Sequence, residues 1–332
     1  MSKSDKQDLS LRVVSSLIEA PAAGLRLDFW LGRRFSYRSR KQWQDEIRAG
    51  TILLNGHTAR GSRILRAGDE VSYHPRAESL EEPLCDLNYQ VCHEDEDMLV
   101  LNKPGNLPSH PAGRFFQHTL WRLLQDRWPG AQIVNRLDRE TSGLVIAAKN
   151  PASTARLSAL FADGKVRKSY FVLVHGVFEG EATASGFLGP DGKSAVRKKR
   201  LFISSSELPA PSPGWESAET LFSGLGSSDG FSAIRAEPKT GRLHQIRATL
   251  LSMGFPILGD KLYGLDEKFY LRFIEGGITE NDQALLVMPR QALHAAAISF
   301  KEPESERVFR FEIAPPGDML SLWQACTGLA AQ

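Results

Sequence analysis

One aspartate between two arginines is the strongest candidate for chemistry in this sequence. Asp138 lies between Arg136 and Arg139 in the polar stretch 135–143, whose Thr-Ser-Gly ending is typical of a turn. The apolar run 144–148 that follows indicates a buried strand. Arginine neighbours keep a carboxylate ionised, and a loop held between buried elements still leaves it accessible to a ligand. Taken alone, the same residues fit surface ion pairs equally well, because such pairs are common and mostly solvated.

Three groups of residues resemble the motifs of the RluA-type pseudouridine synthases. The stretch 135–143 reads Asn-Arg-Leu-Asp-Arg-Glu-Thr-Ser-Gly, similar to the family's His-Arg-Leu-Asp-x-x-Thr-Ser-Gly, with Asn135 in the place of the usual histidine. Residues 168–170 read Lys-Ser-Tyr and match Lys-x-Tyr. Residues 240–247 match Thr-Gly-Arg-x-His-Gln-x-Arg, and a Gly-Asp-x-x-Tyr-Gly follows at 259–264.

The resemblance covers most of residues 88–318 and implies an isomerase that acts on RNA. Pseudouridine formation breaks the bond from the ribose to ring nitrogen 1, turns the uracil and rejoins it through carbon 5. Because both halves of the uridine stay bound, no cofactor and no metal ion is required. The implied roles are Asp138 as the catalytic carboxylate, Tyr170 stacking on the target uracil, Arg247 pairing with the carboxylate, and Arg136 occupying the space of the flipped base.

Residue chemistry alone leaves several of these roles open. Asp138 can attack the sugar or the base, or remove a sugar proton, and each role needs a fixed, ionised group. Without the resemblance, Tyr170 is better interpreted as a core residue of a strand and Arg247 as an ordinary arginine on a helix surface. Lys103, in an Asn-Lys-Pro turn, is either a phosphate contact or a structural lysine. His110, beside prolines, is interpreted as a packing or substrate-contact residue.

Basic residues gather towards the N-terminus. Residues 25–76 contain eleven Lys and Arg against five Asp and Glu, whereas residues 77–97 contain no Lys or Arg and eight Asp and Glu. This change of sign marks a domain boundary near residues 77–88. The apolar spacing within 25–76 predicts two helices and a small hairpin, with Ser39 as the N-cap of the second helix and Asn-Gly at 55–56 as the hairpin turn.

The module 25–76 resembles an S4-type RNA-binding domain. The matching residues are Arg-Leu-Asp at 26–28, Ser-Arg at 39–40, Gly-Thr-Ile-Leu-Leu-Asn-Gly at 50–56 and Gly-Asp-Glu-Val at 68–71. The resemblance implies RNA as the partner, since arginine suits phosphates and stacks on bases; a domain that contacts an acidic protein is the alternative. The residues expected to bind RNA are Arg33, Arg34, Arg38, Arg40 and Lys41 in this module, and Arg136, Lys168 and Arg242 beyond it.

The length of 332 residues fits one large and one smaller domain. We expect an N-terminal lead-in at 1–24 with one short strand at most, the S4-like domain at 25–76, an acidic linker at 77–88, a catalytic domain at 89–318 and a C-terminal tail at 319–332. The expected fold class is α+β, with a mixed, mostly antiparallel sheet and flanking helices in the catalytic domain. The basic run 197–200 is either a phosphate patch or the solvated rim of a hairpin.

Apolar spacing also places individual elements in the catalytic domain. Helices are predicted at 117–130, 152–161 and 243–253, the last with Leu243, Ile246 and Leu250 facing inward. Strands are predicted at 98–101, 144–148, 201–203, 231–238, 297–300 and 307–313, and residues 165–174 are interpreted as a basic turn that leads into a further buried strand. Residues 179–230 look variable, and loop is expected at 204–206 and 209–214.

Composition and cysteine usage favour the cytoplasm. The three cysteines are scattered and lack zinc-ligand spacing, which suits a reducing compartment. No apolar run approaches the roughly 18 residues that a membrane span needs, and the polar N-terminus lacks a signal-peptide core. We expect a monomer that contacts no membrane.

Other enzyme classes lack the residues that they need. A glycosidase requires two opposed carboxyl groups, and the central stretch offers only Asp138 and Glu140. A metalloenzyme lacks its ligand cluster, and a P-loop or dinucleotide site lacks its glycine pattern. The sequence therefore predicts an RNA pseudouridine synthase. Ribosomal RNA is the favoured substrate, because S4-type domains accompany ribosomal targets in several relatives; a transfer-RNA pseudouridine synthase and a catalytically silent RNA-binding protein are the alternatives.

Overall fold

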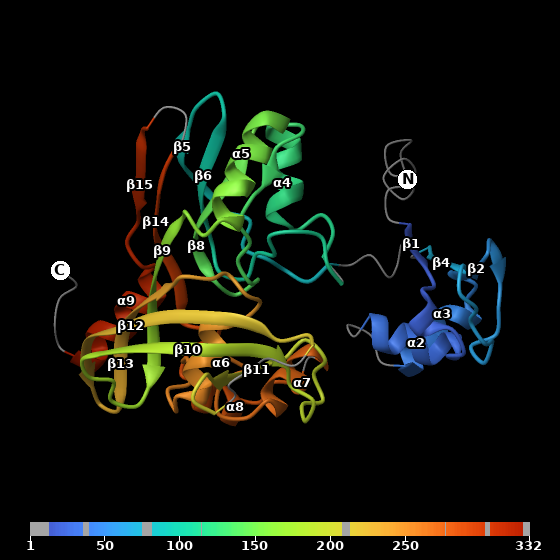
Figure 1. The fold of residues 1–332 in the computed structure, drawn as a ribbon. Helices are drawn as coiled ribbons and strands as arrows, with labels where there is room; N and C mark the ends of the chain where they lie inside the picture. The colour runs from blue at the N-terminus through green and yellow to red at the C-terminus, as the bar shows by residue number, and fades with distance from the viewer. Residues whose placement is uncertain are drawn as a thin grey trace. The chain divides into compact units, whose positions relative to one another are not determined.

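The chain folds into two compact units (Figure 1). The computed structural model describes residues 13–35, 40–74, 82–113, 115–207, 213–275, 277–302 and 306–327. The smaller unit contains Met1–Leu84 and Pro111–Gln117, and the larger unit contains Cys85–His110 and His118–Gln332. In the described parts of the chain, no helix is both long enough and apolar enough to cross a membrane.

The smaller unit packs two helices and a short 3-10 helix with a four-stranded antiparallel sheet. The strands lie in the order β1 (Val14–Leu17), β4 (Glu70–Tyr73), β2 (Ile52–Leu54), β3 (His57–Thr58). The helices are α2 (Leu27–Arg34) and α3 (Arg40–Arg48), and the 3-10 helix is η1 (Ala20–Ala22). Their apolar faces meet the sheet around Trp43, which is fully buried. The predicted pattern of two helices and a hairpin is confirmed; the predicted N-cap Ser39 lies outside the described residues.

Strand β1 belongs to this sheet, although it falls in the segment 1–24 that was expected to lead into the module. Val14 lies opposite Tyr73 of β4, and Leu17 lies opposite Glu70. The sequence gives a weak signal here because Val14 and Leu17 are both exposed, so the strand shows no alternation of buried and exposed residues. The sheet of the smaller unit therefore begins at residue 14.

The larger unit is built on one sheet of eleven strands, and the expected α+β class with a mostly antiparallel sheet is confirmed. The order is β11-β10-β12-β13-β9-β14-β8-β6-β5, with β15 beside β14 and β7 beside β8. Among the strand pairs of the described residues, only β8 and β14 run parallel. The strands are β5 (Gln90–Glu94), β6 (Met98–Lys103), β7 (Gln132–Ile133), β8 (Ser142–Ala148), β9 (Arg167–His175), β10 (Glu181–Pro190), β11 (Arg200–Ser204), β12 (Glu216–Ser228), β13 (Phe231–Pro238), β14 (Leu293–Lys301) and β15 (Val308–Glu312).

Strand β8 is buried on both faces, which explains its continuous apolar sequence. Val145 and Ala147 pack with α4 (Leu120–Arg127), while Leu144 and Ile146 pack with α5 (Pro151–Ala162). All seven residues of β8 are buried. In Figure 1, α4 and α5 lie beside β6 and β8, whereas α6 (Gln245–Ser252), α7 (Lys268–Glu275) and α8 (Glu280–Leu286) gather near β10 and β11. Such a strand is a rigid support for the loop that precedes it.

Two strands within residues 179–230 were not predicted from the sequence. Strands β10 and β12 occupy 181–190 and 216–228, and they pair with each other and with β11 and β13. Glycine and serine dilute the strand signal in β12, and the register shifts between Gly224 and Gly226. Only the neighbouring strands supply the partners that make this segment regular.

Two boundaries also differ from the predictions. Helix α6 begins at Gln245, because His244 adopts the left-handed conformation with φ 58° and ψ 20°. Leu243 consequently lies outside the helix and is 44% exposed, whereas Ile246 and Leu250 are buried as predicted. At the C-terminus, the expected tail contains most of α9 (Gly317–Thr327), whose Met319 is buried in the core of the larger unit.

The parallel contact between β8 and β14 depends on Gly143. Gly143 has φ +116°, and a Cβ built on it would lie 2.3 Å from the carbonyl oxygen of Ala295. We predict that Gly143→Ala lowers the free energy of unfolding by about 3 kcal/mol or more, because the two strands must separate. Gly130→Ala is the matched control: Gly130 has φ +90° with no atom within 4 Å of its built Cβ, so it loses only about 1–2 kcal/mol. Equal losses in calorimetry would contradict this account.

Candidate active site

The loop that carries Asp138 is held through its own backbone. The Lys103 Nζ, which is fully buried, donates to the carbonyl oxygens of Pro104 and Leu107 at 2.8 Å and of Arg139 at 3.2 Å. The guanidinium of Arg290 donates to the carbonyl of Glu140 at 3.2 Å. Buried carbonyl groups need such partners, so these cations fix the course of the loop. Of the two interpretations of Lys103, the structural one holds.

Side chains before the aspartate add to this support. The Asn135 Oδ1 accepts the N–H of Ile146 at 2.7 Å, and its Nδ2 donates to the carbonyl of Leu144 at 3.4 Å. The Ser109 hydroxyl donates to the carbonyl of Leu137 at 2.8 Å. Asn135, which departs from the family's histidine, therefore ties the start of the loop to β8 by its neutral amide.

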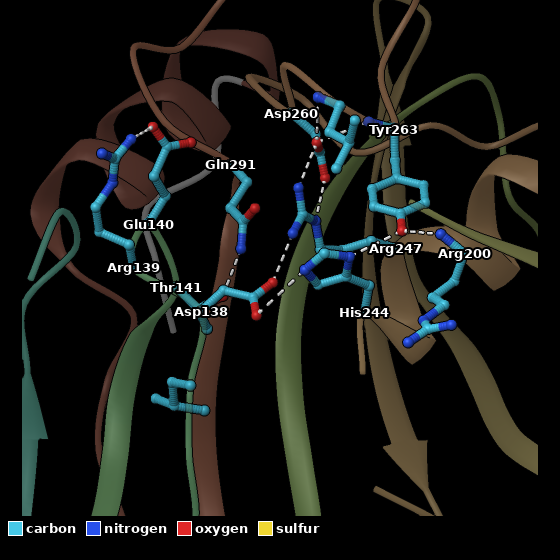
Figure 2. A network of polar contacts seen from close by, with 12 residues as sticks. Asp138, Arg139, Glu140, Thr141, Arg200, His244, Arg247, Asp260, Tyr263 and Gln291 are labelled. Carbon is cyan, nitrogen blue, oxygen red and sulfur yellow. Dashed lines mark hydrogen bonds and ion pairs between the residues drawn. The ribbon is translucent and has the colours of Figure 1, made fainter. Parts of the chain in front are cut away.

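Arg247 joins the loop to helix α6. Its Nη1 donates to the Asp138 Oδ2 at 2.6 Å, while its Nε and Nη2 donate to the two carboxylate oxygens of Asp260 at 2.6 and 2.8 Å (Figure 2). Asp260 is fully buried, and its Oδ1 also accepts the N–H groups of Leu262 and Tyr263 at 2.9 Å. Asp260 thus fixes the orientation of the guanidinium, whose third nitrogen, Nη1, points to Asp138.

Charge balance keeps both carboxylates ionised. Burial by itself raises the pKa of Asp138, but the neighbouring His244 and Arg247 outweigh it and hold that pKa well below its ordinary value. Burial likewise raises the pKa of Asp260, and Arg247 together with the backbone N–H groups reverses the shift. Burial lowers the pKa of Arg247, yet the two carboxylates raise it above its usual value.

A cleft of about 620 Å³ opens over Asp138, and residues from all three motifs line it. Asp138, Tyr170 and Arg247, the three residues expected to be catalytic, meet at this cleft. Burial and the Asp138 carboxylate raise the pKa of Tyr170 to about 12, so its phenol is neutral. Asp138 keeps 27% of its side chain exposed, so its carboxylate can meet a ligand.

The three basic residues of the larger unit that were expected to bind RNA also line the cleft. Arg136 is exposed, the Lys168 Nζ donates to the carbonyl of Thr240 at 3.3 Å, and Arg242 is exposed beside Glu216 at 3.0 Å. The cleft is therefore polar at its rim and ionic at its floor. Among the described residues, no group of three or more His, Cys, Asp or Glu could hold a metal ion.

Two residues outside the predicted set lie beside Asp138 and Arg247: His244 lines the cleft, and Tyr263 contacts His244. His244 places its Nε2 3.9 Å from the Asp138 Oδ1, and its Nδ1 lies 2.8 Å from the hydroxyl of Tyr263. Burial lowers the pKa of His244 to about 4. Both residues fall in matched motifs, as does Asp260, but only the fold shows that they surround Asp138 and Arg247.

The basic run 197–200 is divided between different environments. Lys199 pairs with Glu267 at 2.8 Å, and the backbone N–H of Arg200 donates to the Tyr263 hydroxyl at 2.7 Å. Lys198 is exposed, lies 4.6 Å from the ring centre of Tyr270, and its charge lowers the pKa of Asp138. The run is therefore not one uniform patch.

The basic residues of the smaller unit lie on the surface of its helices. Arg33, Arg34, Arg40 and Lys41 are exposed, and Arg38 lies outside the described residues. Arg40 also has a structural bond, because its Nη2 donates at 3.0 Å to the buried carboxylate of Asp28. Arg40 therefore contributes both to the surface charge of this unit and to the stability of its core.

The larger unit matches the family model described as RNA pseudouridylate synthase over residues 97–252. The chain is similar to the ribosomal large subunit pseudouridine synthase D of Zymomonas mobilis, with 30% identity over 72% of this chain and 73% of that protein. It is also similar to the uncharacterized RNA pseudouridine synthase YlyB of Bacillus subtilis, with 28% identity over 90% of this chain and 92% of that protein. Human RNA pseudouridylate synthase domain containing 1 shares the fold, with a TM-score of 0.55 and 24% identity over 74% of this chain and 90% of that one.

The shared guanidinium gives the stability of the larger unit a pH dependence. Asp138 and Asp260 have lowered folded-state pKa values, so their contribution is present above the unfolded value of 3.8 and is lost as the pH falls through the folded values. We predict that Asp260→Asn lowers stability at neutral pH by about 3–5 kcal/mol, because it removes one partner of a buried pair.

Calorimetry at several pH values tests this prediction. The unfolding temperature of the wild type should fall more steeply than that of Asp260→Asn below about pH 4. Asp126→Asn, which removes an exposed carboxylate 3.3 Å from Arg122, is the control and should change little. Parallel pH profiles for the wild type and Asp260→Asn would contradict the proposed charge balance.

Proposed function

The chain belongs to the RluA-type RNA pseudouridine synthases, and on that premise we propose that it isomerises specific uridines of ribosomal RNA with Asp138 as its catalytic carboxylate. Membership of this family makes the protein an isomerase that acts on RNA. One observation carries the finer proposal: a partly exposed, ionised Asp138 is fixed by Arg247 at the floor of a cleft. The curated relatives named as ribosomal large subunit pseudouridine synthases support ribosomal RNA as the substrate.

The two oxygens of Asp138 have different surroundings. Oδ2 accepts the bond from Arg247 at 2.6 Å. Oδ1 has no hydrogen bond to the residues that the structure describes, and lies 3.9 Å from the Nε2 of His244. The proposal therefore assigns the reaction to Oδ1, as the atom that attacks the uridine or removes its sugar proton. Arg247 keeps this group ionised and correctly turned at neutral pH.

The cleft also suits a base taken out of its helix. Extruding a uridine from a duplex costs a few kcal/mol. We assign the uracil to the neutral phenol ring of Tyr170, on which it can stack. Arg136, exposed at the rim of the same cleft, would occupy the space that the base leaves.

Phosphate contacts are assigned to two places on the chain. Lys168 and Arg242 line the cleft, where the strand beside the flipped nucleotide would pass. The smaller unit is proposed as an S4-type RNA-binding module whose exposed Arg33, Arg34, Arg40 and Lys41 bind phosphates. Such contacts raise affinity without reading sequence.

The central role of Asp138 predicts a clean separation of catalysis from binding. Asp138→Asn should abolish pseudouridine formation in purified RNA, because the amide cannot attack or accept the proton, while RNA affinity stays nearly unchanged. The measurement is pseudouridine content after incubation, together with a filter-binding titration. Asp229→Asn, which replaces an exposed aspartate in a turn, is the matched control and should keep full activity. Turnover by Asp138→Asn would refute the assignment.

The proposed module predicts a change in salt dependence. The double variant Arg33→Ala/Arg34→Ala should weaken RNA binding and reduce the slope of log affinity against log salt by about 1 for each lost phosphate contact. Arg40 is left intact, because its loss would free the buried Asp28. The control Lys301→Ala/Arg310→Ala removes two exposed charges from β14 and β15 of the larger unit. An unchanged slope in the first variant would remove these arginines from the RNA contacts.

A further inference from the structure

His244 has an unusual backbone conformation at the edge of the site. Its φ of 58° and ψ of 20° lie in the left-handed region, which few residues other than glycine adopt, with asparagine, aspartate and histidine the commonest of them. It directly precedes α6 and makes no side-chain cap bond to that helix. The conformation is thus not explained by capping. Instead it sets the imidazole between the carboxylate of Asp138 and the hydroxyl of Tyr263 (Figure 2).

The hydrogen atoms around Tyr263 can be assigned by counting donors and acceptors. Its hydroxyl has one hydrogen and can accept from other donors. The backbone N–H of Arg200 donates to this oxygen at 2.7 Å. The only other polar partner recorded for it among the described residues is the Nδ1 of His244, at 2.8 Å. The hydroxyl hydrogen is therefore directed to Nδ1, which must accept it.

This assignment determines where the imidazole carries its own hydrogen. Burial lowers the pKa of His244 to about 4, so the ring is neutral at physiological pH and carries a single N–H. Because Nδ1 is the acceptor, that hydrogen lies on Nε2. Nε2 faces the Asp138 Oδ1, where a lone pair would be repelled by the carboxylate.

The distance between the two groups leaves Nε2 without a direct bond to the carboxylate. Nε2 and the Asp138 Oδ1 are 3.9 Å apart, which is too long for a hydrogen bond. A single substrate can therefore touch both atoms. We propose that Tyr263 is a positioning residue that holds His244 as the Nε2–H tautomer, and that this N–H donates a hydrogen bond to a carbonyl oxygen of the uracil while Asp138 reacts.

This inference rests on the proposed function, because it assigns a further donor to the same reaction. When the bond from the ribose to the ring breaks, the departing uracil carries negative charge that its carbonyl oxygens share. A neutral N–H donor placed at such an oxygen stabilises the charge without giving up its proton. Because its pKa is low, the neutral ring donates this hydrogen bond over the whole physiological pH range. His244 neither gains nor loses a proton in the reaction.

The tautomer can be measured in the full-length protein without any substrate. We expect two-bond ¹H–¹⁵N correlation spectra of ¹⁵N-histidine-labelled protein to show His244 as Nε2–H, identified by the signals that are missing in His244→Gln. Tyr263→Phe should convert His244 to a mixture of tautomers. A wild-type His244 protonated on Nδ1 would overturn the proposal. Thermal melts accompany Tyr263→Phe, since this variant also removes the acceptor for the Arg200 N–H.

Single-turnover kinetics test the donor role. His244→Asn suits the left-handed backbone but its amide is too short to reach the uracil, so the rate of pseudouridine formation should fall by about 10²-fold with RNA affinity unchanged. His244→Gln carries an N–H at a longer reach and should lose less. Equal rates for the wild type and His244→Asn would overturn the proposal, as would equal losses in Asn and Gln. Wild-type protein that forms no pseudouridine would instead refute the proposed function, and the donor role with it, while the tautomer remains separately measured.

Discussion

The site depends on one guanidinium shared by two carboxylates. Burying Arg247 without a partner would cost free energy. Burying either carboxylate alone would raise its pKa and favour the protonated form. The buried Asp260 accepts hydrogen bonds from the Nε and Nη2 of the arginine and is itself held by backbone N–H groups. The direction of the third nitrogen, Nη1, is therefore fixed. Asp138 accepts a hydrogen bond from this Nη1, and the positive charge of Arg247 helps to keep the carboxylate ionised and oriented. The carboxylate proposed to react is thus positioned by α6 and the turn that follows it, although it lies on the loop before β8.

The loop before β8 must also be rigid, because a mobile Asp138 would not keep its hydrogen bond to Arg247. Buried Lys103 and Arg290 satisfy backbone carbonyls of the loop, and Lys261 binds the carboxylate of Glu140 at 2.9 Å. Cations are strong donors to carbonyl groups in a protein interior, so they replace the regular bonds that a strand or helix would give. Burial lowers the pKa of Lys103 to about 7, and the negative charge of the nearby Asp138 opposes this shift.

Local patterns predicted the elements and the principal residues, and tertiary contacts explain what they did not predict. The apolar run 144–148 is buried on both faces, so its sequence alone indicated β8. Asp138, Tyr170 and Arg247 each came with a recognisable motif, and the cleft brings them together. Nothing in the spacing of His244, Asp260 and Tyr263 shows that they enclose Arg247, because this arrangement exists only after α6 packs against the sheet. The strands β10 and β12 were missed for the same reason: their glycine- and serine-containing sequences become regular only beside their neighbours.

The central claim is that this Asp138 site isomerises uridines of ribosomal RNA. The most direct measurement is transcriptome-wide pseudouridine mapping in cells that contain the protein, in cells that lack it, and in cells in which only the Asp138→Asn form is present. The account predicts that one or a few positions in ribosomal RNA lose pseudouridine without the protein, and that the Asp138→Asn form does not restore them. Identical maps in all three cells, or positions restored by the Asp138→Asn form, would contradict it.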